Sequence, residues 1–126
     1  MLTNHNKDLC RNFIDLAFTQ KKPTQAAKLY LSASYIQHNP HAQDGRDAFS
    51  TRFERYFQEH PDTEVLVKRI VAEGNLVMMH IHAKSGPDDR GEAVVEIFRV
   101  ENGKIAEHWD VVQSVPAQSA NQNSMF

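Results

Sequence analysis

The second half of the chain contains four β-rich runs separated by turn signals, and this order constrains the fold more than any other feature. The breaks between the runs are Glu73-Gly74-Asn75, the loop SGPDDRG and Asn102-Gly103. Asn-Gly between two apolar runs is the strongest short signal for a two-residue hairpin, so the last two runs are expected to pair antiparallel. The whole half therefore predicts an antiparallel meander, whose strands are EVLVKRIVA, LVMMHIHAK, EAVVEIFRV and KIAEHWDVVQSV.

The first half of the chain has the apolar spacing of three helices. The first is expected from about Asn4 to Gln20, the second begins at Pro23, and the third ends before Pro61. A β-favouring pair, Tyr35-Ile36, lies between the second and third. The third helix carries an aromatic stripe that needs a sheet to cover, namely Phe49, Phe53, Tyr56 and Phe57. This order predicts an α+β fold, with three helices on one face of a curved, mainly antiparallel sheet of four or more strands.

Composition limits the chain to one domain and a narrow range of partners. With 126 residues and 40% hydrophobic content, it forms one core, which we expect over residues 1–116, followed by a disordered polar tail at 117–126. The net charge is −2 without a basic run, which argues against nucleic acid and anionic membrane surfaces. A lone cysteine, Cys10, and the absence of an N-terminal apolar segment predict a cytoplasmic protein without an intrachain disulfide.

The last β-rich run contains an unusual residue for a strand, Asp110, between Trp109 and Val111. Aspartate has poor strand propensity, and a buried carboxylate is costly. The residue is therefore either a surface or structurally paired acid, or an acid that the fold tolerates for chemistry.

Strand register indicates which side chains accompany Asp110. If the Asn-Gly turn has two residues, Val95 stands opposite Asp110 and Ile97 opposite His108, whereas Glu96 lies on the other face. An acid among apolar neighbours is partly desolvated and can act as a general base near neutral pH. Asp110 is therefore the first candidate catalytic residue.

Two segments of the chain resemble SnoaL-like polyketide cyclases of the nuclear transport factor two-like superfamily. They are YIQHNP followed by GRDAF, and the closing VEIFRVENGKIAEHWDVVQ. The resemblance runs from about Lys7 to Pro116 and implies a cone-shaped barrel of helices closed over a bent sheet, with a deep apolar pocket. Ketosteroid isomerases and limonene epoxide hydrolases share that fold, so the fold alone does not name the reaction.

The same resemblance implies roles for several residues. It makes Asp110 the catalytic acid/base, and it brings a polar side chain near His38 to the pocket. In limonene epoxide hydrolases the strand equivalent to 76–84 sends an arginine and an acid into the pocket. By analogy His80 and His82, which share one face of that strand, are expected to point inward. The absence of that arginine and second acid argues against epoxide hydrolysis.

We therefore expect Asp110, His82 and His38 to converge as catalytic residues. The inward orientation of His80 and His82 requires His80 to stand opposite an odd-numbered residue such as Val95. Further residues are expected to bind the substrate: His80, His108, Tyr35, Phe53, Val95 and Ile97. Trp109 is expected to pack on the opposite face of the sheet.

A metal site is an alternative, because His-x-His is also a ligand spacing. Gly74 and the two histidines match the opening of the cupin motif, but Ser85, Gly86 and Pro87 stand where its glutamate should follow. A site formed by His38, His80, His82 and Asp110 is conceivable. The three N-terminal helices do not suit a cupin barrel, and we expect neither metal nor cofactor.

Two functions remain open from the sequence. The first is a cyclase or isomerase that abstracts a proton next to the carbonyl of a small apolar or polyketide-like molecule. The second is a non-catalytic ligand-binding or dimerisation module of the same fold. Because apolar residues lie on both faces of the meander, we also expect a homodimer.

Overall fold

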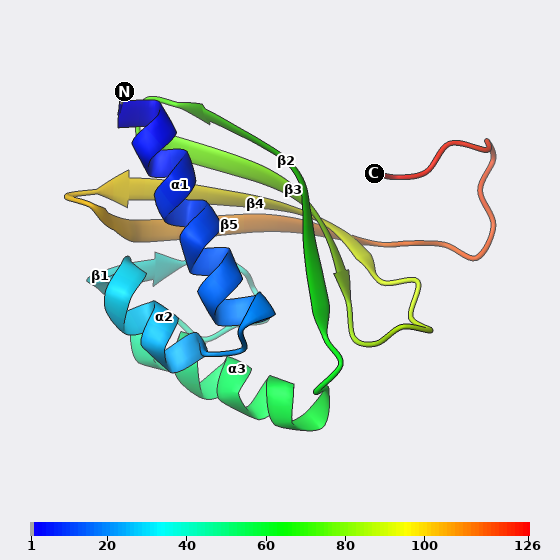
Figure 1. Ribbon diagram of the computed structural model, residues 1–126, viewed down its shortest axis with the longest axis horizontal. Coiled ribbons are helices and arrows are strands. Elements are labelled where there is room, and N and C mark those ends of the chain that lie inside the picture. The colour runs from blue at the N-terminus through cyan, green and yellow to red at the C-terminus, as the bar shows by residue number, and fades with distance from the viewer. Residues whose placement is uncertain (1) are drawn as a thin grey trace.

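The computed structural model describes residues 2–126 and contains three α-helices packed on one face of a curved sheet (Figure 1). A five-residue π-helical turn extends the first helix, which agrees with the long helical pattern expected up to residue 20. The helices are α1 (Leu2–Ile14), α2 (Pro23–Tyr30) and α3 (Arg46–Glu59), and the π-turn is η1 (Asp15–Thr19). The predicted α+β class is confirmed.

The sheet has five strands in the order β1-β5-β4-β3-β2. The four predicted runs form the antiparallel part, and the segment around Tyr35-Ile36 adds a fifth strand parallel to β5. This strand begins directly after α2 and brings its polar end beside the middle of β5. The strands are β1 (Leu31–Gln37), β2 (Glu64–Glu73), β3 (Leu76–Lys84), β4 (Glu92–Glu101) and β5 (Lys104–Ser114).

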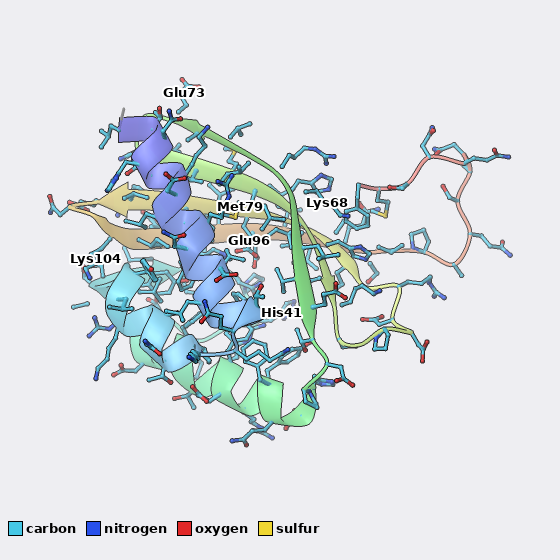
Figure 2. The ribbon with its side chains drawn as sticks, viewed as in Figure 1. His41, Lys68, Glu73, Met79, Glu96 and Lys104 are labelled. Atoms are coloured by element: carbon cyan, nitrogen blue, oxygen red, sulfur yellow. The ribbon has the colours of Figure 1, made fainter. Side chains whose placement is uncertain are left out.

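The core lies between the helices and one face of the sheet, which we call the helix-covered face. Met79 is buried there and Glu96 also points to this side, whereas Glu73 and Lys104 lie at the periphery (Figure 2). The aromatic stripe of α3 enters this core, where Phe49 contacts Phe13 of α1 with ring centroids 5.4 Å apart. The helices thereby leave the opposite face of the sheet, the open face, without a helical layer.

The predicted Asn-Gly hairpin joins β4 to β5. Asn102 and Gly103 both have positive φ, 52° and 73°, as a two-residue turn of this kind requires. Glu101 pairs with Lys104 as expected, but the register then shifts by one residue. Val100 pairs with Ile105 and Arg99 with Glu107, so Ala106 is an extra residue in β5, a β-bulge.

The bulge corrects the predicted faces. Beyond it, Asp110 pairs with Glu96 rather than with Val95, and both acids lie on the helix-covered face. Val95 and Ile97 lie on the open face, so their predicted place beside Asp110 is wrong. The reason is that side chains alternate with a period of two, and one extra residue moves all later side chains to the other face.

The bulge also reverses the expectation for the two histidines of β3. His80 does stand opposite Val95, as the prediction required, but Val95 is on the open face. His80 and His82 therefore point away from the helices. The ring of Phe126, at the end of the C-terminal tail, stacks on His82 with centroids 4.0 Å apart. Residues 115–126 form neither helix nor strand, and their path loops away from the body before returning (Figure 1).

Among the helices of residues 2–126, none has both the length and the apolar content that crossing a membrane requires.

Candidate functional site

A cavity of about 220 Å³ lies between the helices and the helix-covered face. Its walls are mainly aromatic and aliphatic, and the side formed by β1, β4 and β5 carries a group of polar residues that we call the polar wall. Small-molecule sites commonly combine an apolar body with a few convergent polar groups. The lining residues include Phe13, Phe18, Phe49, Phe53, Tyr56, Val65, Ile81, Val94, Phe98, Tyr35, Gln37, Asn39, Arg52, Glu96, His108 and Asp110.

The centre of the polar wall is a histidine between two carboxylates. His108 Nε2 contacts Glu96 Oε2 closely and lies 3.9 Å from Asp110 Oδ2. The three side chains are 8%, 18% and 11% exposed for His108, Glu96 and Asp110. The bulge at Ala106 makes this group possible, because it turns His108 and Asp110 to the face that already carries Glu96.

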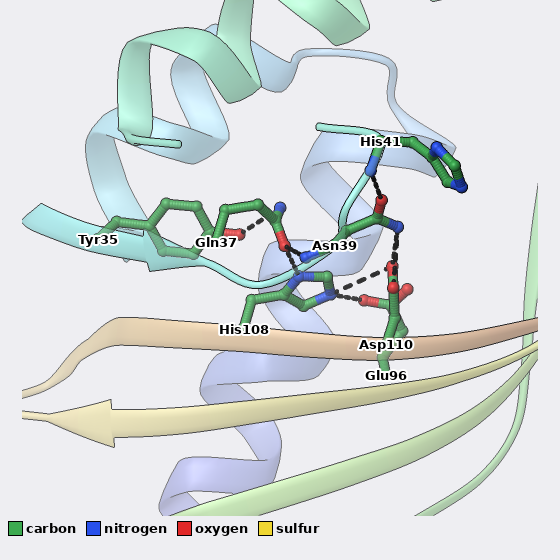
Figure 3. A network of polar contacts seen from close by, with 7 residues as sticks. All are labelled: Tyr35, Gln37, Asn39, His41, Glu96, His108 and Asp110. Atoms are coloured by element: carbon green, nitrogen blue, oxygen red, sulfur yellow. Dashed lines mark hydrogen bonds and ion pairs between the residues drawn. The ribbon is translucent and has the colours of Figure 1, made fainter. Parts of the chain in front are cut away.

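Two amide side chains from the end of β1 hold the wall in place (Figure 3). Asn39 Nδ2 lies 2.8 and 3.0 Å from the two oxygens of Asp110, and Gln37 Oε1 lies 2.6 Å from His108 Nδ1. Backbone N–H groups settle which end of each amide is the oxygen. The N–H of His41 donates to Asn39 Oδ1 at 2.8 Å, and the N–H of Asn39 donates to Gln37 Oε1 at 3.0 Å.

The protonation of His108 follows from these contacts. Because Gln37 presents an oxygen, His108 Nδ1 must carry a proton to donate to it. His108 Nε2 faces the Glu96 carboxylate, so the ring donates at both nitrogens when it is an imidazolium. Burial lowers the pKa of His108, but the charges of Glu96 and Asp110 and the hydrogen bond to Glu96 outweigh it, and the pKa is raised. The site therefore favours the imidazolium form of His108 between two carboxyl groups.

Tyr35 places a hydroxyl group at the end of the same network. Its oxygen accepts a hydrogen bond of 3.2 Å from Gln37 Nε2, which leaves the O–H free to donate. Burial, followed by the charges of Glu96 and Asp110, raises the pKa of Tyr35, so the phenol stays protonated at physiological pH. Tyr35 is thus a neutral donor in the wall of the cavity.

The same three side chains are the group in residues 2–126 whose geometry suits a metal ion. The ligand atoms of Glu96, His108 and Asp110 lie within 4.8 Å of one another. Without an ion, however, the acids of the wall already have hydrogen-bond partners, since His108 donates Nε2–H to Glu96 and Asn39 donates to Asp110. A cation would have to displace the proton on His108 Nε2. The metal site considered from the sequence does not form, because His38, His80 and His82 lie away from Asp110's face.

The cavity brings together only part of the residues expected from the sequence. Asp110, His108, Tyr35 and Phe53 line it. The remaining five do not: His80, His82, Val95 and Ile97 lie on the open face, and His38 lies outside the cavity. The expected convergence of His82 and His38 with Asp110 is therefore wrong.

His38 is directed to the open face by the alternation of β1. Its Nε2 lies 2.6 Å from Glu107 Oε2, and its ring stacks on Trp109 with centroids 4.8 Å apart. Trp109 thus packs on the face opposite Asp110, as predicted. The imidazole belongs to a surface cluster of polar side chains that continues through Glu107 to Arg99.

The residues of the cavity that were missed in the sequence include Glu96, Gln37, Asn39 and Arg52. The period of two was the available signal for Gln37 and Asn39, which follow Tyr35 at alternate positions. Glu96 was placed on the wrong face because nothing in the local sequence marks the bulge. Arg52 lies one position before Phe53 on the aromatic face of α3.

Comparisons with known proteins agree with this architecture. Residues 8–120 match the family model of SnoaL-like polyketide cyclases. No functionally curated protein matches the chain. The three solved structures described next are each below 25% identical to the chain and therefore show the fold alone.

Three of these structures illustrate the range of names attached to the fold. TsrD from Streptomyces laurentii has a TM-score of 0.71 and 19% identity, with 86% of this chain and 88% of that chain covered. A protein from Kribbella flavida, provisionally assigned as a ketosteroid isomerase, has a TM-score of 0.73 and 20% identity, with 94% and 85% covered. AclR from Streptomyces galilaeus, provisionally assigned as a hydroxylase, has a TM-score of 0.72 and 23% identity, with 90% and 82% covered.

The match over residues 8–120, with the sheet order and the helix-lined cavity described above, establishes that this chain belongs to the SnoaL-like polyketide cyclase family.

Proposed function

We propose that the protein catalyses proton transfer at a carbon next to the carbonyl group of a small, largely apolar molecule, with Asp110 as the general base. The observation that carries the proposal is the Asp110 carboxylate in the wall of an apolar cavity, held by Asn39 and 3.9 Å from a protonated histidine. Positioned acids and bases of this kind contribute about 10²–10⁴-fold to proton-transfer rates.

In the proposed reaction, three side chains of the polar wall have different roles. Asp110 takes the proton from the carbon, and the electron pair of that C–H bond moves onto the carbonyl oxygen as an enolate. Tyr35 O–H donates a hydrogen bond to this oxygen, and the imidazolium of His108 stabilises the negative charge electrostatically. Asp110 then returns the proton to a different carbon in an isomerisation. In a cyclisation, the enolate carbon attacks a second carbonyl, the π electrons of that C=O bond move onto its oxygen, and this oxygen takes the proton from Asp110.

Glu96 supports His108 rather than acting as the base. Its Oε2 is occupied by His108 Nε2–H, which makes this carboxylate the counter-ion of the imidazolium. The oxygens of Asp110 contact only the Nδ2 of Asn39 at hydrogen-bond distance, so lone pairs remain for a substrate proton. The two acids therefore differ in their partners: Glu96 is the counter-ion of His108, and Asp110 keeps lone pairs for the substrate.

Deuterium exchange tests the proposal without knowledge of the natural substrate. The probes are acetophenone and 4-acetylbenzoate, whose methyl protons lie next to a carbonyl, and the measurement is loss of the methyl NMR signal in D₂O. The protein is expected to exchange at least one probe faster than buffer alone. Binding of both probes without exchange above the buffer rate would reject catalysis and favour the ligand-binding module.

Tyr35→Phe is expected to lower the exchange rate by about 10²–10³-fold, because it removes a hydrogen-bond donor to the enolate oxygen. Tyr30→Phe is the matched control, since Tyr30 packs against Phe13 and does not line the cavity. The control should retain the rate within about twofold. A Tyr35→Phe protein with the full rate would remove Tyr35 from the mechanism.

We also propose that the open face of the sheet forms a homodimer. Cross-strand pairing places several exposed apolar side chains on this one face: Leu66, Val71, Met78, Val95 and Val111. A contiguous apolar surface of this kind is typical of a protein interface. At micromolar concentration, light scattering should give twice the 14.4 kDa mass of the chain.

Val95→Lys is expected to shift the protein to the monomer, because Val95 lies on β4, the middle strand of the sheet. Leu29→Lys is the control, as Leu29 is an exposed apolar residue on α2. A monomeric mass for the unmodified protein would contradict the dimer, and so would a Val95→Lys protein that remains dimeric.

A further inference from the structure

Arg52 is an arginine whose environment differs from that of every other arginine in residues 2–126. It lies on the face of α3 that carries Phe49, Phe53 and Tyr56, and it lines the cavity with them. Its guanidinium carbon lies 5.0 Å from the centroid of the Phe53 ring. Each of the other six has a hydrogen bond or ion pair with the protein: Arg11, Arg46, Arg55, Arg69, Arg90 and Arg99. Within residues 2–126 Arg52 has neither.

Neither Glu96 nor Asp110, the two carboxylates of the polar wall, forms an ion pair with Arg52. Glu96 is paired with His108, and Asp110 with Asn39, and neither lies within 4.0 Å of the Arg52 guanidinium. Burial has the largest influence on the pKa of Tyr35 and of His108, and Arg52 is among the smaller influences, lowering both. Arg52 therefore influences the polar wall electrostatically but is not paired with either of its carboxylates.

The other charged residues of the cavity leave Arg52 available. Asp89 lines it, but both Asp89 oxygens accept hydrogen bonds within their own loop, from Ser85 and from the Gly91 N–H. Glu92 lines it as an exposed acid, and the cation Lys84 lines it as well. The guanidinium thus retains its five donors for a ligand, in the planar arrangement that suits a carboxylate.

We propose that Arg52 binds a carboxylate of the ligand, so that the substrate is a small keto acid with an apolar or aromatic body. The apolar walls take the body, Arg52 takes the carboxylate, and the carbonyl lies at Tyr35 and Asp110. The carbonyl part rests on the proposed function, whereas the choice of an anionic over a neutral ligand rests on Arg52 alone.

A pair of probes with the same aryl ketone body, one anionic and one neutral, tests this. Dissociation constants of 4-acetylbenzoate and its methyl ester are measured by NMR titration for the full chain, together with Arg52→Gln and the matched control Arg55→Gln. Arg55 lies on the same helix but pairs with Glu59 and does not line the cavity. The unmodified protein and Arg55→Gln should bind the acid about tenfold more tightly than the ester, and Arg52→Gln should bind both alike.

The two proposals fail separately. A preference for the acid that disappears in Arg52→Gln supports the carboxylate site even if no deuterium exchange is found. Equal binding of acid and ester by the unmodified protein would overturn it, even if exchange occurs. An unchanged preference in Arg52→Gln would overturn it equally, because the discrimination would then come from another cation such as Lys84.

Discussion

Asp110→Asn is expected to lower the rate of deuterium exchange by about 10²–10⁴-fold, the usual contribution of a general base. The amide of asparagine is close in size to the carboxylate but cannot accept the proton. An oxygen of the new side chain can still accept from Asn39 Nδ2, which donates to Asp110 in the native protein. The fold should therefore persist while the reaction is lost.

Two measurements separate this result from general damage. Glu107→Gln is the control, because it changes a carboxylate of the same strand that lies on the open face and pairs with Arg99 and His38. Its exchange rate should stay within about twofold of the native rate. Urea unfolding should give Asp110→Asn a free energy close to native. A stable Asp110→Asn protein that still exchanges protons would exclude Asp110 as the base.

His108→Gln is expected to have the largest effect on stability, about 3–5 kcal/mol in the free energy of unfolding. The substitution removes the cation that lies between Glu96 and Asp110 and leaves two nearly buried carboxylates facing each other. Urea unfolding measures the loss. His41→Gln is the control, since His41 is exposed and its side chain makes no contact with this network.

A second substitution makes the cause of that loss testable. In His108→Gln/Glu96→Gln one of the two facing charges is removed, so part of the stability should return. If the double substitution is as unstable as the sum of the two single ones, the loss comes from packing around the ring and not from the unpaired acids.

The position of His108 between Glu96 and Asp110 also predicts how the stability of the protein depends on pH. Folding raises the pKa of His108 above its ordinary value near 6.5, so the folded state binds the proton more tightly than the unfolded state. This contribution is complete below pH 6.5 and is lost as the pH rises through the folded-state pKa. The unfolding free energy should therefore fall on the alkaline side, and this fall should be absent in His108→Gln.

Local sequence patterns were sufficient for the elements and for one catalytic candidate. The alternation in the second half, with the Asn-Gly turn, predicted four paired strands because turn geometry and strand periodicity are local properties. A carboxylate in the middle of an apolar strand marked Asp110, because a strand seldom tolerates an acid without a partner. The resemblance of two segments was enough to indicate the family and the α+β class.

The faces of the strands depended on the tertiary structure. One extra residue, Ala106, reverses every later side chain of β5, and it moved Glu96 into the site and Val95 and Ile97 out of it. The bulge has no marker in the sequence, since alanine fits a regular strand as well. His80 and His82 also lie on the open face, although His80 stands opposite Val95, the pairing that their inward orientation was expected to require.

The sequence by itself determined the three helices, the four strands of the antiparallel part, where the hairpin turns, and that an acid stands in the middle of the last strand. Only the tertiary structure decided which polar groups share a cavity with that acid. Gln37 contacts His108 and Asn39 contacts Asp110, each across 71 residues of sequence, because β1 lies parallel beside β5. Propensities and periodicities act over a few residues, whereas such a contact exists only once the core has placed distant strands side by side.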